Sequence, residues 1–136
     1  MRRLAIPAVL LLLLTFATPV TASDPTYRAT LAGPGPTGTI SVTISGTTGT
    51  LQWNLAHLAR NSMVTVAVRG GTCAAPHGLV VQSRWQARFI NGRSSQTRTL
   101  DPAWVTLFNR SWTSHRGDAV TVTNAGHTEC VAFVRG

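Results

Sequence analysis

Residues 39–56 read TISVTISGTTGTLQWNLA, and this stretch decides the fold class. Apolar residues alternate with polar ones in two runs that flank a short glycine-bounded turn. The apolar members are Ile40, Val42 and Ile44 in the first run and Leu51, Trp53 and Leu55 in the second. A period of two is typical of a half-buried strand, and two such runs around a short glycine loop predict a β-hairpin.

Similar short segments follow along the chain. Met63 to Arg69 places Val64, Val66 and Val68 on one face. Further strands are predicted at 27–31, 79–82 (continued less regularly to Trp85), 88–90, 96–100, 119–123 and 130–134. Asn91-Gly92 indicates a tight hairpin turn between 88–90 and 96–100, and Asp101-Pro102 indicates the start of one short helix near 102–109. Seven to eight short strands predict an all-β fold, either an antiparallel Greek-key sandwich or a flattened barrel.

The composition agrees with a folded, positively charged domain. Of the 136 residues 43% are hydrophobic and only 12% are charged, the reverse of the balance in disordered chains. All 12 basic residues are arginine, against four acids, so the formal net charge is +8. This length is that of one domain.

The N-terminal segment has the three parts of a secretory signal peptide. Arg2 and Arg3 precede an apolar stretch from Leu4 to Phe16, and Val20-Thr21-Ala22 supplies the small residues of a cleavage site. The apolar stretch is shorter than the roughly 20 residues that cross a membrane. We therefore expect a secreted protein, cleaved after Ala22, with residues 23–136 as a single domain and no membrane span; the alternatives are a retained anchor or a buried helix.

The chain has two cysteines, Cys73 in a glycine-rich loop and Cys130 near the C-terminus. In an exported chain an even number of cysteines predicts a disulfide rather than a metal-ligand pair or a reactive thiol. We expect Cys73 and Cys130 to be bonded.

Several short motifs resemble those of CHRD-type and copper/zinc superoxide dismutase-like sandwiches of secreted proteins. They are Gly38-Thr39-Ile40 through Leu55-Ala56-His57-Leu58, the strand Met63 to Arg69, Gly71-Thr72-Cys73-Ala74-Ala75-Pro76, and Thr128-Glu129-Cys130-Val131-Ala132. The resemblance covers about residues 28–82, and 119–134 more loosely; residues 83–118 show none. It implies a Greek-key sandwich in which two metal-binding histidines lie on the strand before Gly-Thr-Cys.

Those histidine positions fall on Ala67 and Arg69 in this chain. Copper and zinc need several imidazole or carboxylate ligands, which alanine and arginine do not supply. We therefore expect no cofactor and no dismutase activity. The alternative is a metal-binding or dismutase-like enzyme with relocated ligands, for which the loop histidines His77, His115 and His127 are the candidates.

Other catalytic classes find little support. Gly-x-Ser-x-Gly is absent, four acids are few for a triad or a carboxylate pair, and neither Gly70-Gly71 nor Gly33–Pro36 is a phosphate loop. No nucleic-acid-reading motif occurs, so we expect no nucleic-acid partner.

A binding function has more support in the sequence. Arginines and aromatic residues interleave in the region without resemblance, and guanidinium groups bind carboxylate, sulfate and phosphate. The candidate anion- or partner-binding residues are Arg69, Arg84, Arg88, Arg93, Arg98, Trp85 and Trp112. The alternative is that the tryptophans are core and the arginines a solvated rim. The sequence thus predicts a non-catalytic module that binds an anionic polysaccharide or a cell-surface protein; a third hypothesis is a domain that packs against another protein.

Overall fold

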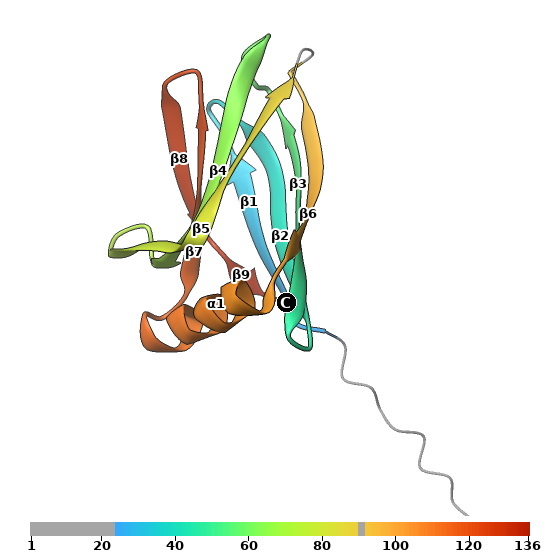
Figure 1. Cartoon of the computed structure of the whole chain (residues 1–136). Helices are drawn as coiled ribbons and strands as arrows, with labels where there is room; N and C mark the ends of the chain where they lie inside the picture. The colour runs from blue at the N-terminus through green and yellow to red at the C-terminus, as the bar shows by residue number, and fades with distance from the viewer. Residues whose placement is uncertain (1–23, 90–91) are drawn as a thin grey trace, which may run out of the picture.

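The structure, a computed structural model, describes residues 24–89 and 92–136, with the side chains of 77–89 excluded. It confirms an antiparallel sandwich of two sheets, with no closed barrel (Figure 1). Sheet A has the order β6-β3-β2-β1-β9 and sheet B the order β5-β4-β7-β8. The strands of sheet A are β1 (Thr26–Ala32), β2 (Thr37–Ser45), β3 (Thr48–Ala56), β6 (Ser94–Leu100) and β9 (Val134–Arg135). Those of sheet B are β4 (Ser62–Gly71), β5 (Pro76–Phe89), β7 (Asp118–Asn124) and β8 (His127–Ala132).

The expected hairpin is β2–β3, in which Ser45 pairs with Thr48 across a two-residue turn. Gly46 has φ +63° there, a conformation that glycine adopts without strain. The strands begin closer to the turn than predicted, since Thr48 and Gly49 already belong to β3.

The core lies between the two sheets, where the alternating apolar residues meet. Sheet A contributes Ile40, Val42, Leu51 and Trp53, and sheet B contributes Val64, Val66, Val68, Val120 and Val122, all fully buried. The Trp53 indole nitrogen donates a 3.0 Å hydrogen bond to the Ser94 hydroxyl, which joins the buried faces of β3 and β6. Each buried aliphatic side chain contributes about 1.5–3 kcal/mol.

The hairpin predicted at Asn91-Gly92 is wrong. Residue 91 lies outside the described residues, but the flanking strands belong to different sheets: β5 pairs with β4, and β6 pairs with β3. This crossing is the Greek-key connection, because β6 returns beside β3 after two strands in the other sheet. The predicted segment 79–82 and residues 88–89 of the segment 88–90 belong to one strand, β5, which follows β4 along its length with register shifts near Arg69; residue 90 lies outside the described residues.

Helix α1 (Pro102–Ser114) is longer than the predicted 102–109. Its aromatic residues explain the difference, because Trp104, Phe108 and Trp112 recur at four-residue spacing and their rings stack in sequence. The stripe packs against Tyr27 and closes one end of the sandwich (Figure 1).

The predicted closing strand 130–134 is divided at Phe133. This residue is buried and its backbone N–H donates to the Asp118 carbonyl, so the chain leaves sheet B after Ala132 and enters sheet A at Val134. The described residues thus form eight strands, in agreement with the predicted seven to eight, and a ninth, β9, that is only two residues long.

Candidate functional site

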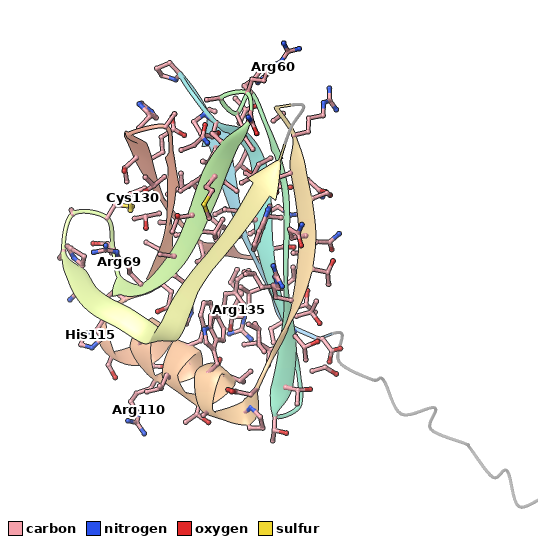
Figure 2. All side chains as sticks on the ribbon, turned by 45° about the horizontal axis from the view of Figure 1, so that its top comes forward. Arg60, Arg69, Arg110, His115, Cys130 and Arg135 are labelled. Carbon is pink, nitrogen blue, oxygen red and sulfur yellow. A yellow bond between two sulfur atoms is a disulfide. The ribbon has the colours of Figure 1, made fainter. Side chains whose placement is uncertain are left out.

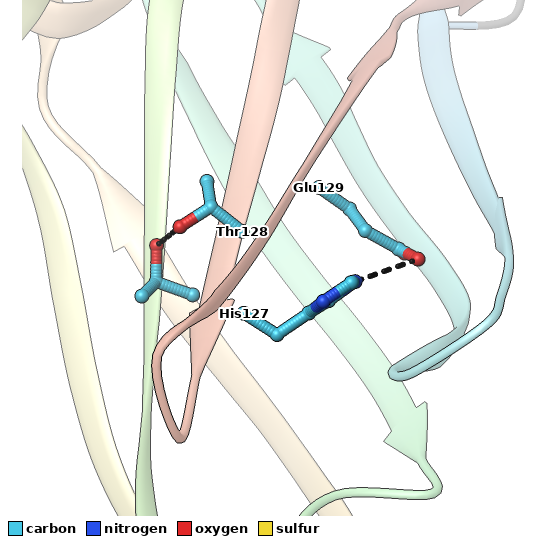
Figure 3. A network of polar contacts seen from close by, with 4 residues as sticks. His127, Thr128 and Glu129 are labelled. Atoms are coloured by element: carbon cyan, nitrogen blue, oxygen red, sulfur yellow. Dashed lines mark hydrogen bonds and ion pairs between the residues drawn. The ribbon is translucent and has the colours of Figure 1, made fainter.

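The four acids differ in exposure: Asp24 and Asp101 are exposed, whereas Glu129 is partly buried and Asp118 fully buried. Asp101 caps α1, with its carboxylate accepting from the Trp104 N–H at 2.8 Å. Glu129 lies 3.4 Å from the His127 imidazole, a contact that Figure 3 shows beside the Thr123–Thr128 hydroxyl pair. Asp118 is buried, with 1% of its surface exposed.

Asp118 is the most unusual of these groups. Neither carboxylate oxygen has a hydrogen-bond partner of regular geometry. Burial raises the pKa of Asp118 to about 7, and the nearby Ser111 hydroxyl lowers it only in part. A substantial share of the Asp118 carboxyl groups is therefore neutral near pH 7, which reduces the negative charge that this acid carries.

The arginines with described side chains are not neutralised by these acids. They are Arg28, Arg60, Arg69, Arg93, Arg98, Arg110, Arg116 and Arg135. None forms an ion pair with a carboxylate among the described residues. Arg135 instead lies over the Tyr27 ring, 5.8 Å from its centroid. The result is a surface with many guanidinium groups that can bind an external anion.

The outward face of sheet A, which we call the hydroxyl face, is a regular grid of small polar side chains. Three register rows cross β1, β2, β3 and β6: Arg28, Ser41, Gln52 and Thr97; Thr26, Thr43, Thr50 and Thr99; and Thr30, Thr39, Asn54 and Ser95. All are half-buried or exposed. Four strands at about 4.8 Å spacing make this face about 14 Å wide.

The hydroxyl face has one arginine at each margin, and no acid occupies the outward positions of these four strands. Arg28 lies on β1 at one margin, and Arg93 precedes β6 at the other, beside Asn54 and Ser95. The two arginines are separated by three strand spacings across the sheet and by four residues along the strand direction, so their Cα atoms are about 19 Å apart. Alternation with Ile40, Val42 and Ile44 predicts polar residues on the opposite face, but no role was predicted for them, and Arg28 was not among the candidate residues. The threonines that continue through four strands were the signal available.

The other predicted anion-binding residues are dispersed. Arg69 is half-buried on the outward side of sheet B, on the same side of the molecule as Cys130 in Figure 2, and its Nε has no partner. Arg98 shares the inward side of sheet A with Leu51, its pairing partner, and its Nε is also buried without a partner. Trp112 packs on Tyr27 and Phe108, partly buried. The side chains of Arg84, Arg88 and Trp85 lie outside the described residues.

The predicted disulfide is confirmed. Cys73 and Cys130 are bonded, with their Cα atoms 5.8 Å apart, and the bond ties the loop after β4 to β8. Both cysteines of the chain are thereby used, so neither is a free thiol.

The candidate metal histidines are not brought together in the part that the structure describes. His115 follows α1 and lies near the start of β7, whereas His127 begins β8 and lies near the end of β7. Because β7 is a strand of seven residues, the two histidines are about 20 Å apart. The His77 side chain lies outside the described residues. Searching the described residues finds no group of three His, Cys, Asp or Glu side chains that could hold a metal ion.

No protein-family model, curated protein or solved structure matches this chain. In the described residues, no helix combines the length and apolar character that crossing a membrane requires.

Proposed function

We propose that this chain is a non-catalytic, exported binding module whose hydroxyl face holds an anionic polysaccharide. The observation that carries the proposal is the pairing of an acid-free polar grid with guanidinium groups that no carboxylate neutralises. The disulfide supports an oxidising compartment, as does the predicted signal peptide.

The chemistry of the grid suits a sugar polymer. Hydroxyl and amide side chains both donate and accept hydrogen bonds, as sugar hydroxyls do. A broad sheet face about 14 Å wide matches an extended chain better than a small molecule, which proteins bind in concave pockets.

The arginines supply selectivity for charge. Arg28 and Arg93 present guanidinium forks at opposite margins of the face, and such forks pair with carboxylate or sulfate in two parallel hydrogen bonds. No aromatic side chain occupies the outward positions of the grid, so stacking on sugar rings does not contribute there. Affinity should therefore depend on the anionic groups and fall with salt.

A charge introduced at the centre of the grid tests this proposal. Gln52→Glu places a carboxylate between the two margins, and Thr106→Glu on the exposed side of α1 is the control with the same change in net charge. Like charges about 4 Å apart in water repel by about 1 kcal/mol. We expect Gln52→Glu to weaken binding to polygalacturonate about fivefold at low salt, and Thr106→Glu to change it much less.

The measurement is equilibrium binding to immobilised polygalacturonate and dextran sulfate, with neutral dextran as the reference. Arg93→Gln should weaken both polyanions and leave neutral dextran unaffected. Equal losses in Gln52→Glu and Thr106→Glu, or failure of the unmodified protein to bind either polyanion, would show that the hydroxyl face is only a solvated surface.

The resemblance to dismutase-like sandwiches stays a prediction; the disulfide joins the Gly71-Thr72-Cys73 and Glu129-Cys130 motifs on which it rests. Ala67 and Arg69, at the two positions where it implies histidines, belong to β4 and pair with Thr121 and Ala119 of β7. None of these side chains is a usual copper or zinc ligand, which favours a binding role over the metal-dependent alternative.

A further inference from the structure

We propose that the groove between β1 and β8 binds an extended segment of a partner protein, which carries a carboxylate next to apolar side chains. The groove has a volume of about 640 Å³. It is lined by Thr26, Arg28 and Thr30 of β1 and by Val131, Ala132 and Val134 near the C-terminus. This inference does not depend on the polysaccharide proposal.

Two strand edges without a hydrogen-bonded partner in the described structure border this groove. β1 pairs with β9 only at Tyr27 and Arg28, so no described strand is hydrogen-bonded to its edge from Ala29 to Ala32. β8 pairs with β7 on one side, and no described strand is hydrogen-bonded to its other side. Unpaired strand edges are where an extended peptide adds to a sheet.

The backbone of β1 is oriented to accept such a strand. The Pro25 carbonyl accepts from Ile44 of β2 at 3.1 Å, and the Thr26 carbonyl accepts from Gly136 on the opposite side at 2.8 Å. Because backbone groups alternate direction along a strand, those of Arg28 and Thr30 face the same side as Thr26. Thr30 therefore directs its N–H and C=O into the groove, where no described strand meets them.

The lining also selects the side chains of the occupant. Val134 is 69% exposed, the most exposed large hydrophobic residue among those described, and Val131 is partly buried against the core. Arg28 is exposed and has no ion pair in the described structure, while Glu129 on β8 contacts His127 instead. An apolar wall beside a guanidinium without an ion pair complements a peptide that has apolar residues at alternate positions and one carboxylate.

A peptide fits these features better than other ligands. A lipid chain would leave the Thr30 backbone groups without partners, and an anionic sugar chain would gain nothing from Val131 and Val134. The main-chain hydrogen bonds of an added strand satisfy the edge, and its alternate side chains reach the valines.

The experiment is selection of random octapeptides displayed on phage against the protein with its disulfide intact. We expect enriched sequences with apolar residues at alternate positions and at least one Asp or Glu. Val134→Ser should weaken the selected peptides about tenfold through lost apolar burial, whereas Met63→Ser, at the other exposed hydrophobic residue, should not. Amide resonances of Thr30 and Ala32 should shift when the peptide is added.

The two proposals fail separately. Val134→Ser leaves the charges of the hydroxyl face unchanged and should not affect polygalacturonate, and Gln52→Glu lies two strands from β1 and should not affect the peptide. No enrichment, enriched peptides without a carboxylate, or equal binding by the two serine variants would overturn the groove proposal. So would displacement of the peptide by self-association, since a second copy would then be the occupant.

Discussion

Replacing Asp118 with asparagine should stabilise the protein above neutral pH and change its stability little near pH 4. Asp118 is 1% exposed and neither carboxylate oxygen has a regular hydrogen-bond partner. Ionisation in this environment is costly, and asparagine has nearly the same shape without a charge to ionise.

The magnitude follows from the pKa of this group in the two states. Burial raises the pKa of Asp118 from 3.8 to about 7, so the unfolded chain loses its proton at lower pH than the folded protein. The stability that the neutral group provides is complete below pH 3.8 and is lost as pH rises to about 7. At about 1.4 kcal/mol per pKa unit, the free energy of unfolding falls by about 4 kcal/mol across this interval.

Urea denaturation at a series of pH values from 4 to 9 measures this loss as a difference between the protein and its Asp118→Asn variant. The difference cancels contributions from the histidines and the other acids. We expect the two to agree within about 1 kcal/mol at pH 4, the value of one hydrogen bond, and the variant to be more stable by up to about 4 kcal/mol at pH 8. Parallel pH profiles would refute the assignment of a neutral buried carboxyl to Asp118.

Three further predictions concern stability. The double variant Cys73→Ser, Cys130→Ser should lose about 4 kcal/mol in urea denaturation, because the bond closes a loop with a sequence separation of 57; an unchanged midpoint would contradict this. Ser94→Ala should lose about 1–3 kcal/mol by leaving the buried Trp53 indole N–H without its acceptor, and Ser95→Ala on the exposed side should lose less. Treatment with EDTA should leave the melting temperature unchanged; a decrease would favour the alternative of relocated metal ligands.

The sequence predicted the local elements better than their assembly. Period-two patterns identified β2, β3 and β4 because one face of each is buried, and a one-residue shift would expose Ile40 or Val64. The turn predicted at Asn91-Gly92 gave no indication of which sheet edge β6 would join. That choice depends on the free edge of β3 and the Trp53–Ser94 contact, which are distant in sequence.

The helix and the last strand were misjudged for a related reason. Polar residues between Phe108 and Ser114 concealed the four-residue spacing that continues to Trp112. At the C-terminus, a single buried residue, Phe133, transfers the chain between sheets, and a short apolar run gives no sign of such a break.

The candidate site was only partly predictable. Alternation places Arg69 and Arg98 on particular strand faces, but the sequence did not reveal that the Arg98 face is the inward one. The hydroxyl face escaped selection because threonine at outward positions is also what an ordinary solvated strand shows. Only the register of four strands reveals that these residues form one acid-free grid.

The position of the disulfide has a mechanical consequence. Tension applied beyond β9 would first detach Val134 and Arg135 from β1, a short pairing that can open one residue at a time. Unravelling would then reach Cys130, where the covalent link passes the load directly to Cys73. The chain between them, which includes β5, β6, α1 and β7, is thus shielded from the pull, and a tethered molecule would lengthen by only a few residues before it resisted.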